Sequence, residues 1–551
     1  MATVRLASIL SISVLLAGCE VAIDCPTDWC GTIVVTSGAE AGTLFPPNYV
    51  FDVDLSLDDL IFEKLADVGP TMNTIGDEDF IPGLADSWSF PDERTIRFTI
   101  GSNARWHDGA PVTAHDVVFT YDVYRDPIVA SAATSRLRFI ESVSAVDDRT
   151  VDIAFAQEYP EMFFDAVYHV RIIPRHILGD VPRESIGTHE FARSPVGSGP
   201  FRFVRWNTAE FVELAADSAY HRGRPGIPRI VWRFAAGGQQ ALMQLLAGEA
   251  DVLNPVTSPL DQERVENAPD YRTEPYPYPV YAYIAFNFRN PDDLGSPHPL
   301  FGEQEVRRAV SELVDGEAVV RGVFGERGFQ SVGPLTSMFG ELYESFTPVP
   351  HLADSAIGTL TSLGWSDSNG DGVLDKDGID FEFDLLVPSS SRARVRSAEI
   401  IQEQLRSHRI RMNIVEMEFT ATFAQAKTGR FDAVFGALGH DPSPSSVTDS
   451  WTPAGFDGYN YGHYNNPNVV LLVDQAQTTP DLAEAKALWK RAFQTVIDDT
   501  PAIWVYVPEF AVALHTRLEG VSIRPDQWSA TMWQWRVDPR NLLTRDVIGS
   551  N

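Results

Sequence analysis

The segment WHDGAPVTAHDVV, residues 106–118, combines a tight turn with the start of a helix. Its first four residues, from Trp106 to Gly109, predict a turn with an aromatic anchor, and His107 is then a turn residue rather than a metal ligand or a base. Thr113 is a good N-cap residue, and Asp116 stands at the third helical position, where a carboxylate interacts favourably with the helix dipole. We therefore expect a helix that begins after Thr113.

Short strands and amphipathic helices alternate on both sides of this segment. Residues 94–100 place Ile96, Phe98 and Ile100 on one face, which is typical of a half-buried strand. Helices are predicted over 395–408 and 481–497, and strands over 32–36, 411–418 and 433–438. This alternation predicts a mixed α/β architecture.

A proline- and tyrosine-rich stretch, residues 269–279, interrupts the pattern. It contains Tyr271, Tyr276 and Tyr278. Repeated prolines stiffen an extended segment and interrupt sheets. We interpret the stretch as a crossing between domains, where a hinge would lie.

Length and charge limit the possible functions. The chain has 551 residues, 44% of them hydrophobic, and a chain of this size usually divides into two or more domains. Acidic residues outnumber basic ones, 76 to 43, so the formal net charge is −33. Phosphate binding needs clustered Lys and Arg, and we therefore expect no nucleic-acid partner.

The N-terminus carries an apolar run from Val4 to Ala17 with one positive charge, Arg5, at its start. The run has 14 residues, whereas a membrane-spanning helix needs about 20, so it predicts an export signal over residues 1–18. No other stretch approaches spanning length. The junction Leu16-Ala17-Gly18-Cys19 resembles the lipobox of bacterial lipoproteins, in which the cysteine becomes the lipidated first residue. The resemblance implies a lipid-anchored protein outside the cytoplasm, periplasmic or at the cell surface.

Two further cysteines, Cys25 and Cys30, follow within a short tether predicted over residues 19–31. In an oxidising compartment a local disulfide between them is the favoured interpretation, and free thiols are the alternative. A metal site would need two more ligands nearby, and the sequence offers none there.

Four blocks of sequence, in order along the chain, resemble one protein family. They are PGLADSW (82–88) with WHDGAPVTAHDVV (106–118), VGSGPFRFV (196–204) with ELAADSAY (213–220), IAFNFRN (284–290) with EVRRAV (305–310), and GWSDSNGDGVLDKDG (364–378). They resemble the family 5 extracellular solute-binding proteins, the oligopeptide- and dipeptide-binding components of ABC importers.

The resemblance implies a periplasmic binding protein-like class II fold, in which two lobes close about a hinge and the first lobe carries an extra subdomain. The expected parts are lobe I (32–52, 193–280 and 508–551), the subdomain (53–192) and lobe II (281–507). It also implies capture of di- to oligopeptides and their delivery to a permease and ATPase complex. No catalysis and no cofactor are implied, and we expect a monomer that reaches the membrane through its lipid anchor only.

Within the family, an aspartate just after a strand binds the α-amino group of the peptide. Matching the chain from Phe431 and Asp432 through the following strand places Asp441 on that position. The alternative is that Asp441 only starts the Asp-Pro-Ser-Pro turn.

The resemblance points to further ligand-binding candidates, some of which depart from the family pattern. Leu438 replaces a tryptophan common in the family, and Phe435 stands where some members carry an arginine. These departures predict a pocket that is less polar than in the best-known members. The remaining candidates are Gly439, Glu40 and the aromatic residues Phe419, Trp451, Tyr459 and Tyr461; Asn48, Tyr49 and Tyr464 are weaker ones, and some of the aromatic residues belong in the core.

An acidic segment, residues 367–378, has calcium-loop spacing. Asp367, Asn369, Asp371 and Asp375 stand at positions one, three, five and nine of an EF-hand loop. The twelfth position is Gly378 instead of the bidentate Glu. A turn held by Asx hydrogen bonds is therefore favoured over a bound ion.

Other functions stay open. The same fold could bind a metal chelate, haem or an oligosaccharide, or pass its ligand to a sensor rather than a permease. An enzyme would need a nucleophile with a base and an orienting group, or an open metal site. Ser198 lies in a Gly-Ser-Gly sequence, but Pro200 follows and the spacing of a nucleophile elbow is absent.

Overall fold

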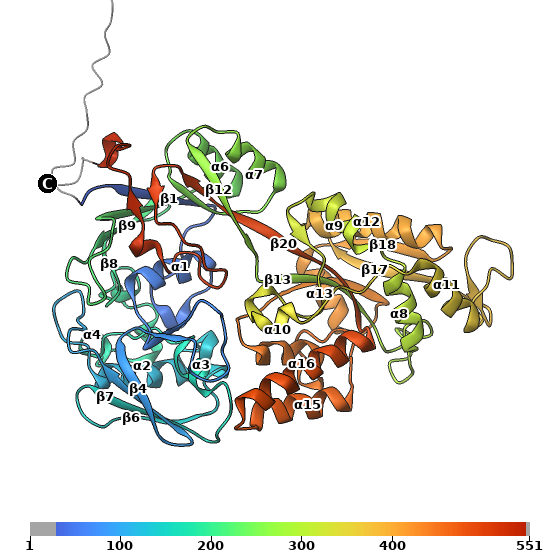
Figure 1. The fold of residues 1–551 in the computed structure, drawn as a ribbon, viewed down its shortest axis with the longest axis horizontal. Coiled ribbons are helices and arrows are strands. Elements are labelled where there is room, and N and C mark those ends of the chain that lie inside the picture. Colours follow the sequence, from blue (N-terminus) through green and yellow to red (C-terminus); the bar gives the residue numbers. More distant parts are fainter. Residues whose placement is uncertain (1–28, 547–551) are drawn as a thin grey trace, which may run out of the picture.

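The computed structural model describes residues 29–546, and within them the fold is mixed α/β, as predicted (Figure 1). One large sheet has the strand order β18-β17-β19-β13-β20-β11-β1-β10-β9-β8, with β12 and β14 paired to β20. Its strands are β1 (Thr32–Ser37), β8 (Phe201–Asn207), β9 (Phe211–Ala216), β10 (Arg229–Phe234), β11 (Val252–Val256), β12 (Tyr271–Pro277), β13 (Val280–Phe286), β14 (Gly328–Phe329), β17 (Glu382–Pro388), β18 (Arg411–Met417), β19 (Ala433–Gly439) and β20 (Ala502–His515).

The sheet extends through two lobes. Lobe I is built on β1 and β8–β11, and lobe II on β13 and β17–β19 (Figure 1). Strand β20 belongs to both: its first residues pair with β13 up to Tyr506, and the residues from Ala511 onward pair with β11. The chain crosses a second time between β12 and β13. These two crossings are the connections about which the lobes can move.

The proline-rich stretch is one of these crossings, although it does not interrupt the sheet. Residues Tyr271–Pro277 form β12 and pair with β20 along their whole length. Because β12 has only that one partner strand in the described part of the chain, its other edge is free. Pro275 and Pro277 lack an N–H donor, and a free strand edge tolerates this loss.

A third unit lies below lobe I in Figure 1 and has its own core. Its four-stranded sheet has the order β4-β5-β7-β6. The separate hydrophobic cluster runs from Leu65 to Ile172, whereas Val53–Phe62 and Ile173–Ala192 pack into the core of lobe I. We therefore propose limits of 65–172 for the subdomain, narrower than the expected 53–192. Its strands are β4 (Ala85–Asp92), β5 (Thr95–Ile100), β6 (Ile140–Ala145) and β7 (Thr150–Phe155).

The helices of lobe I and the subdomain are mostly short. The first of them, α1, follows the loop after β1 and begins at Asp52. They are α1 (Asp52–Ile61), α2 (Ala114–Arg125), α3 (Met162–Val167), α4 (Arg175–Leu178), α5 (Arg183–Ile186), α6 (Gly238–Leu246) and α7 (Pro259–Glu266).

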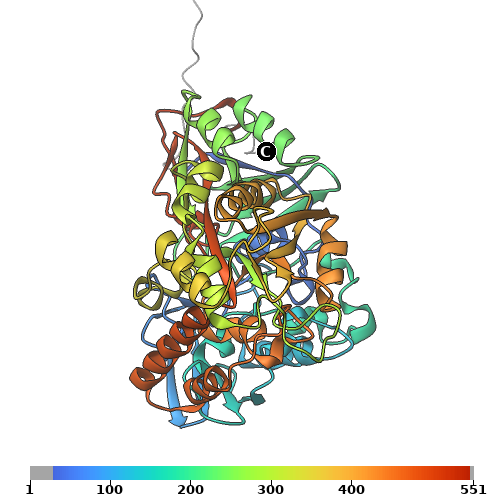
Figure 2. The same ribbon diagram turned by 90° about the vertical axis from the view of Figure 1, so that its right-hand side faces the viewer.

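Lobe II holds the longer helices. In both ribbon views α15 and α16 lie side by side at its lower end (Figures 1 and 2). The helices are α8 (Gln304–Glu312), α9 (Gly316–Phe324), α10 (Glu341–Glu344), α11 (Ala353–Ser362), α12 (Arg392–Ser407), α13 (Phe419–Lys427), α14 (Thr448–Trp451), α15 (Pro467–Thr478) and α16 (Leu482–Asp499). Three short strand pairs lie outside the large sheet. In lobe II, β15 (Asp375–Lys376) pairs with β16 (Ile379–Asp380), and in lobe I, β21 (Leu518–Glu519) pairs with β22 (Arg536–Val537). In the subdomain, β2 (Ala66–Val68) pairs with β3 (Phe80–Pro82).

The predicted turn and helix of residues 106–118 are both present. Helix α2 starts at Ala114, and Asp116 Oδ2 accepts hydrogen bonds from both the backbone N–H and the hydroxyl of Thr113, each at 2.8 Å. His107 Nδ1 accepts from the Gly197 N–H at 3.2 Å, and its Nε2 contacts the Gly199 carbonyl at 2.9 Å. His107 therefore joins this turn to the glycine turn at 197–199.

The glycine turn packs against the end of α1. The Gly199 N–H donates to the Ile61 carbonyl at 2.8 Å. A Cβ on Gly197 would collide with the same carbonyl oxygen. Glycine is required here by close approach of two backbones. The contact holds the glycine turn, and through His107 the subdomain turn, against the helix that carries much of the site.

Candidate functional site

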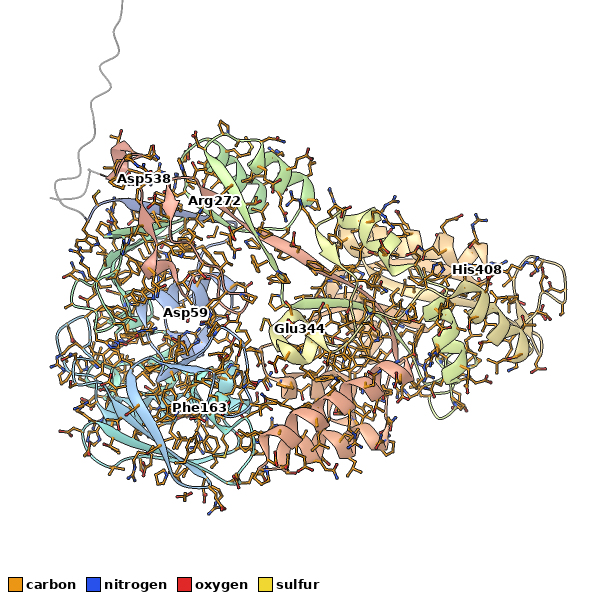
Figure 3. The ribbon with its side chains drawn as sticks, in the orientation of Figure 1. Asp59, Phe163, Arg272, Glu344, His408 and Asp538 are labelled. Atoms are coloured by element: carbon orange, nitrogen blue, oxygen red, sulfur yellow. The ribbon has the colours of Figure 1, made fainter. Side chains whose placement is uncertain are left out.

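A cavity of about 440 Å³ lies between the lobes. Side chains of α1 form one wall; Asp59, labelled in Figure 3, lies on that helix. The hinge residues Tyr276, Tyr278 and Pro279 form another wall, and Asp441 reaches the cavity from lobe II. The other lining residues include Ser37, Tyr49, Asp52, Val53, Ser56, Ala133, Arg136, Tyr168, His169, Arg171, Trp232, Asn254, Pro255 and the segment Pro525–Ser529.

Asp441 is the sequence-predicted acid, and it stands two residues beyond β19. Its Oδ1 accepts a hydrogen bond from the Ser443 N–H at 3.1 Å, so it also starts the predicted turn. Its Oδ2 lies 3.5 Å from an Arg136 guanidinium nitrogen and 3.5 Å from His169 Nε2. Both partners belong to the subdomain, so these contacts cross from one lobe to the other.

The surroundings of Asp441 shift three pKa values. Burial alone would raise the pKa of Asp441, but the contact with His169 and the charge of Arg136 bring it below its ordinary value. Burial lowers the pKa of His169, against the opposing effect of Asp441. Burial also lowers the pKa of His440 to about 4. At neutral pH the site therefore has an ionised Asp441 beside a charged arginine and neutral histidines.

Two other carboxylates of the cavity have strong partners of their own. Asp59 Oδ1 lies 2.7 Å from Arg171 Nε and 2.5 Å from a second guanidinium nitrogen of that residue. Asp526 forms a two-point contact with Arg524, at 3.0 and 2.9 Å. The Arg524–Asp526 pair is bidentate, whereas both guanidinium nitrogens of Arg171 approach a single oxygen of Asp59. In both pairs the arginine compensates the charge of the carboxylate.

A second contact between the lobes lies next to the cavity. The Ser443 hydroxyl of lobe II donates to Glu161 Oε1 of the subdomain at 2.5 Å. Burial raises the pKa of Glu161 to about 8 and that of Asp165 to about 7. Glu161 is 4% exposed. This pair of buried acids thus lies at the closure between the subdomain and lobe II.

Most of the other predicted ligand contacts do not line the cavity. Phe435 is completely buried and packs near Tyr506, so it is a core residue of lobe II. Leu438 and Tyr461 belong to a second core cluster of that lobe, as does Trp451, whose indole N–H donates to the Tyr281 hydroxyl at 2.8 Å. Phe435 and Leu438 lie inside the lobe because both faces of β19 are covered, whereas Trp451 in α14 and Tyr461 in the following loop pack into the core from outside the sheet.

The remaining candidates lie on the surface or near it. Phe419 and Tyr459 are 48% and 53% exposed, and Gly439 ends β19. Glu40 accepts a hydrogen bond from the Trp206 indole N–H at 2.9 Å. Of the weaker candidates, Tyr49 lines the cavity, whereas Asn48 donates to the Val129 carbonyl and Tyr464 is a buried residue of lobe II. The structure therefore brings Asp441 and Tyr49 together and leaves the others outside.

Several cavity residues were not singled out from the sequence. Arg136, His169 and Arg171 come from the subdomain, and no local pattern marks them. Tyr276 and Tyr278 were noticed only as part of the crossing segment. Their position on the hinge, which was predicted, was the signal that could have placed them at the cleft.

The acidic segment 367–378 uses its side chains within the turn. Asp367 Oδ1 accepts from the Gly370 N–H at 2.8 Å, and Asn369 Oδ1 from the Asp371 N–H at 2.9 Å. Asp371 and Asp375 accept from Val373 and Ser368 in the same way. Across residues 29–546, no group of three or more His, Cys, Asp or Glu side chains has the arrangement of a metal site.

The predicted signal peptide, Cys19 and Cys25 lie outside the described residues. Cys30 is disulfide-bonded, and its pairing with Cys25 stays a prediction. Within residues 29–546 no helix has the length and apolar character needed to cross a membrane.

Comparison with known proteins decides the family. Residues 79–459, more than half of the chain, match the family described as bacterial extracellular solute-binding proteins, family 5. The chain belongs to this family.

Individual members of family 5 are similar over most of the chain. The oligopeptide-binding protein AppA of Bacillus subtilis is 28% identical over 451 residues, which is 79% of each protein. The solved structure of that protein, in complex with a nonapeptide, matches with a TM-score of 0.70 at 25% identity and covers 92% of this chain and 99% of its own. NikZ of Campylobacter jejuni, in complex with Ni(L-His), has a TM-score of 0.73 at 22% identity, covering 93% and 100%. The two-lobed class II fold expected from the sequence is confirmed.

Proposed function

We propose that this protein captures peptides in the cavity between its lobes and delivers them to the membrane permease of an ABC importer. The observation that carries the proposal is the cavity itself, which lies at the contact between the lobes and is lined by paired charges and aromatic side chains. Charged pairs can hold the ends of a peptide, and aromatic walls can hold side chains of differing shape. The relative AppA, whose structure contains a nonapeptide, supports peptides as the solute.

Native mass spectrometry of the purified protein tests this function directly. We expect a series of masses that correspond to retained peptides. A single non-peptide mass, such as a metal chelate, haem or sugar, would contradict the proposal and favour the alternative solutes.

We further propose that Asp441 binds the peptide's α-amino group. An ionised carboxylate facing the cavity can form a charge-assisted hydrogen bond with an ammonium. Losing such a contact costs about 1.5–3 kcal/mol, or roughly a tenfold to a hundredfold loss of affinity.

The test compares a peptide with its N-acetylated form in calorimetric titrations. The wild type should prefer the free amine, and Asp441→Asn should remove this preference. Asp449→Asn is the matched control, since Asp449 is an exposed residue of the same segment. Equal preference in Asp441→Asn and wild type would refute this role.

The location outside the cytoplasm follows the family description, whereas the anchor is a proposal. Lipidation of Cys19 would hold the receptor near its permease and raise its effective concentration there. Labelling with a fatty acid in cells should mark the wild type and not Cys19→Ala, and the variant should move from the membrane to the soluble fraction. We also propose that the receptor acts as a monomer, which analytical ultracentrifugation would check.

A further inference from the structure

The carboxylate of Asp52 faces the cavity without a partner. Asp52 is the first residue of α1, and its side chain is exposed at the cavity wall. Among the described residues, no ion pair or hydrogen bond to this carboxylate is present. We infer that Asp52 receives a cationic group of the bound peptide, the ammonium or guanidinium of a basic side chain, and this inference rests on the proposed peptide-binding function.

Every carboxylate that lines the cavity except Asp52 has an arginine beside it, so Asp52 is the carboxylate available to a ligand. Asp59 is paired with Arg171, and Asp526 with Arg524. Asp441 lies beside Arg136 and His169. Asp52 thus leaves one uncompensated negative charge, and a ligand with one positive charge at this wall would complete the balance.

The structural alternative is that Asp52 serves the start of α1. A carboxylate in the first turn interacts favourably with the helix dipole, but the capping hydrogen bonds belong to Asp54. The Asp54 carboxylate accepts from the backbone N–H groups of Gly42, Val50 and Phe51 at 2.7–3.1 Å. Asp52 makes none of these contacts, so the helix start does not depend on it.

Aromatic rings next to Asp52 suit a cation. Tyr278 stacks on Phe510 with 4.3 Å between ring centroids and 30° between planes, which fixes its orientation. Tyr276 is held by a hydrogen bond from its hydroxyl to Asn254 Oδ1 at 2.9 Å. Burial raises the pKa of Tyr278 to about 12, and the charge of Asp52 adds to the increase. The face of a tyrosine ring attracts ammonium and guanidinium groups.

The same wall also covers a buried donor. Trp232 lines the cavity and is 2% exposed, and its indole N–H has no hydrogen-bond partner among the described residues. A buried donor without a partner costs free energy. The indole nitrogen has almost no exposed surface, so a peptide carbonyl would reach it only if the neighbouring side chains move on binding.

Partial burial makes Asp52 responsive to such a ligand. Desolvation, together with the nearby charge of Asp54, raises the pKa of Asp52 above its ordinary value. An arriving cation would favour the charged form and lower the pKa again. The binding of basic peptides should therefore weaken at acidic pH more than the binding of neutral peptides.

The experiment uses calorimetry with the whole protein and synthetic peptides that carry arginine or its neutral isostere citrulline at each position in turn. N-acetylated versions of each peptide separate the terminal ammonium from the side chain. We expect the wild type to prefer arginine over citrulline at one position by tenfold or more. Asp52→Asn should abolish this preference and leave the preference for a free amino terminus intact.

Three further variants make the result specific. Asp52→Glu keeps the charge and should retain part of the arginine preference. Asp122→Asn removes an exposed carboxylate of α2 away from the cavity and should change nothing. Asp441→Asn should affect the terminal ammonium only. Thermal unfolding of each variant checks that the fold is intact.

The outcomes separate this inference from the proposed function. If the wild type binds peptides and Asp52→Asn changes neither preference, the inference is refuted while the function stands. If Asp52→Asn abolishes the preference for a free amino terminus instead, the cationic group at Asp52 is the terminus of the peptide. If the wild type binds no peptide, the function and the inference both fall.

Discussion

Replacing Glu161 by Gln should change how the stability of the protein depends on pH. Glu161 lies at the contact between the subdomain and lobe II, where its Oε1 accepts a hydrogen bond from Ser443. Burial, and next the charge of Asp165, raise its pKa to about 8 from the ordinary 4.5. The groups that face it are Asp165 and Asp441, with Arg136 beyond them. Gln has nearly the same shape and keeps an acceptor for Ser443, but it carries no titrating proton.

The sign follows from proton binding. Between pH 4.5 and 8 the folded protein holds a proton on Glu161, and the unfolded chain does not. The free energy of unfolding therefore falls as the pH rises through this window, by up to about 1.4 kcal/mol per pH unit for this group. Asp165 behaves in the same direction, with a pKa of about 7. The Gln variant should lose the Glu161 contribution and keep that of Asp165.

Urea unfolding at pH 5, 6, 7 and 8 measures this difference. The stability of Glu161→Gln relative to the wild type should improve steadily from pH 5 to pH 8, in total by a few kcal/mol. Glu141→Gln, an exposed residue of the same subdomain, is the control and should show a constant difference. A difference for Glu161→Gln that is the same at every pH would show that Glu161 does not titrate between pH 5 and pH 8.

The remaining predictions concern the frame around the site. Gly197→Ala should destabilise the protein by at least about 2 kcal/mol, since its Cβ would meet a backbone carbonyl, whereas Gly358→Ala, within α11 and with open space, should stabilise it by about 0.5–1 kcal/mol; thermal unfolding checks both. Arg517→Met should cost about 3 kcal/mol in urea unfolding, because it removes the buried guanidinium that Asp251 and Asp546 share and leaves Asp251 with Arg545 alone, while Arg540→Met, at an 81% exposed side chain, should cost little. Burial lowers the pKa of His107 below 6.5, so its contribution to stability should be lost as the pH falls below that value, and nuclear magnetic resonance titration of the ring should show the lowered pKa.

Local patterns were sufficient to predict individual elements of the fold. Ile96, Phe98 and Ile100 alternate with polar residues, and β5 buries those three side chains as expected. Asp481 caps α16, whose buried face includes Ala485 and Leu488. Such signals depend on neighbours a few residues apart, which the sequence shows directly. Leu482 has the spacing of the same face but is 37% exposed, because it stands in the first turn of the helix.

The cavity could be predicted only in part, because distant segments build it. Asp441 was placed by the strand before it and the turn after it, which are local features. Its partners Arg136 and His169 lie roughly 300 residues earlier in the chain, and no spacing rule connects them. Phe435 was predicted to line the pocket from its place in the sequence but lies in the core. Its strand, β19, has a partner strand on each side and side chains packed on both faces, which the local sequence does not show.

The contrast between Asp441 and Asp52 follows from what each carboxylate must give up on binding. Asp441 already has two subdomain groups at 3.5 Å, a separation longer than a strong charge-assisted hydrogen bond, so an ammonium can improve on them. The free energy gained from the ammonium is smaller by the free energy of the Arg136–Asp441 contact that it displaces. Asp52 has no protein partner to lose, and its desolvation by the cavity wall is already present in the folded protein. A cation that binds to Asp52 therefore breaks no contact within the protein, and we expect the preference for basic side chains to depend on Asp52 rather than on Asp441.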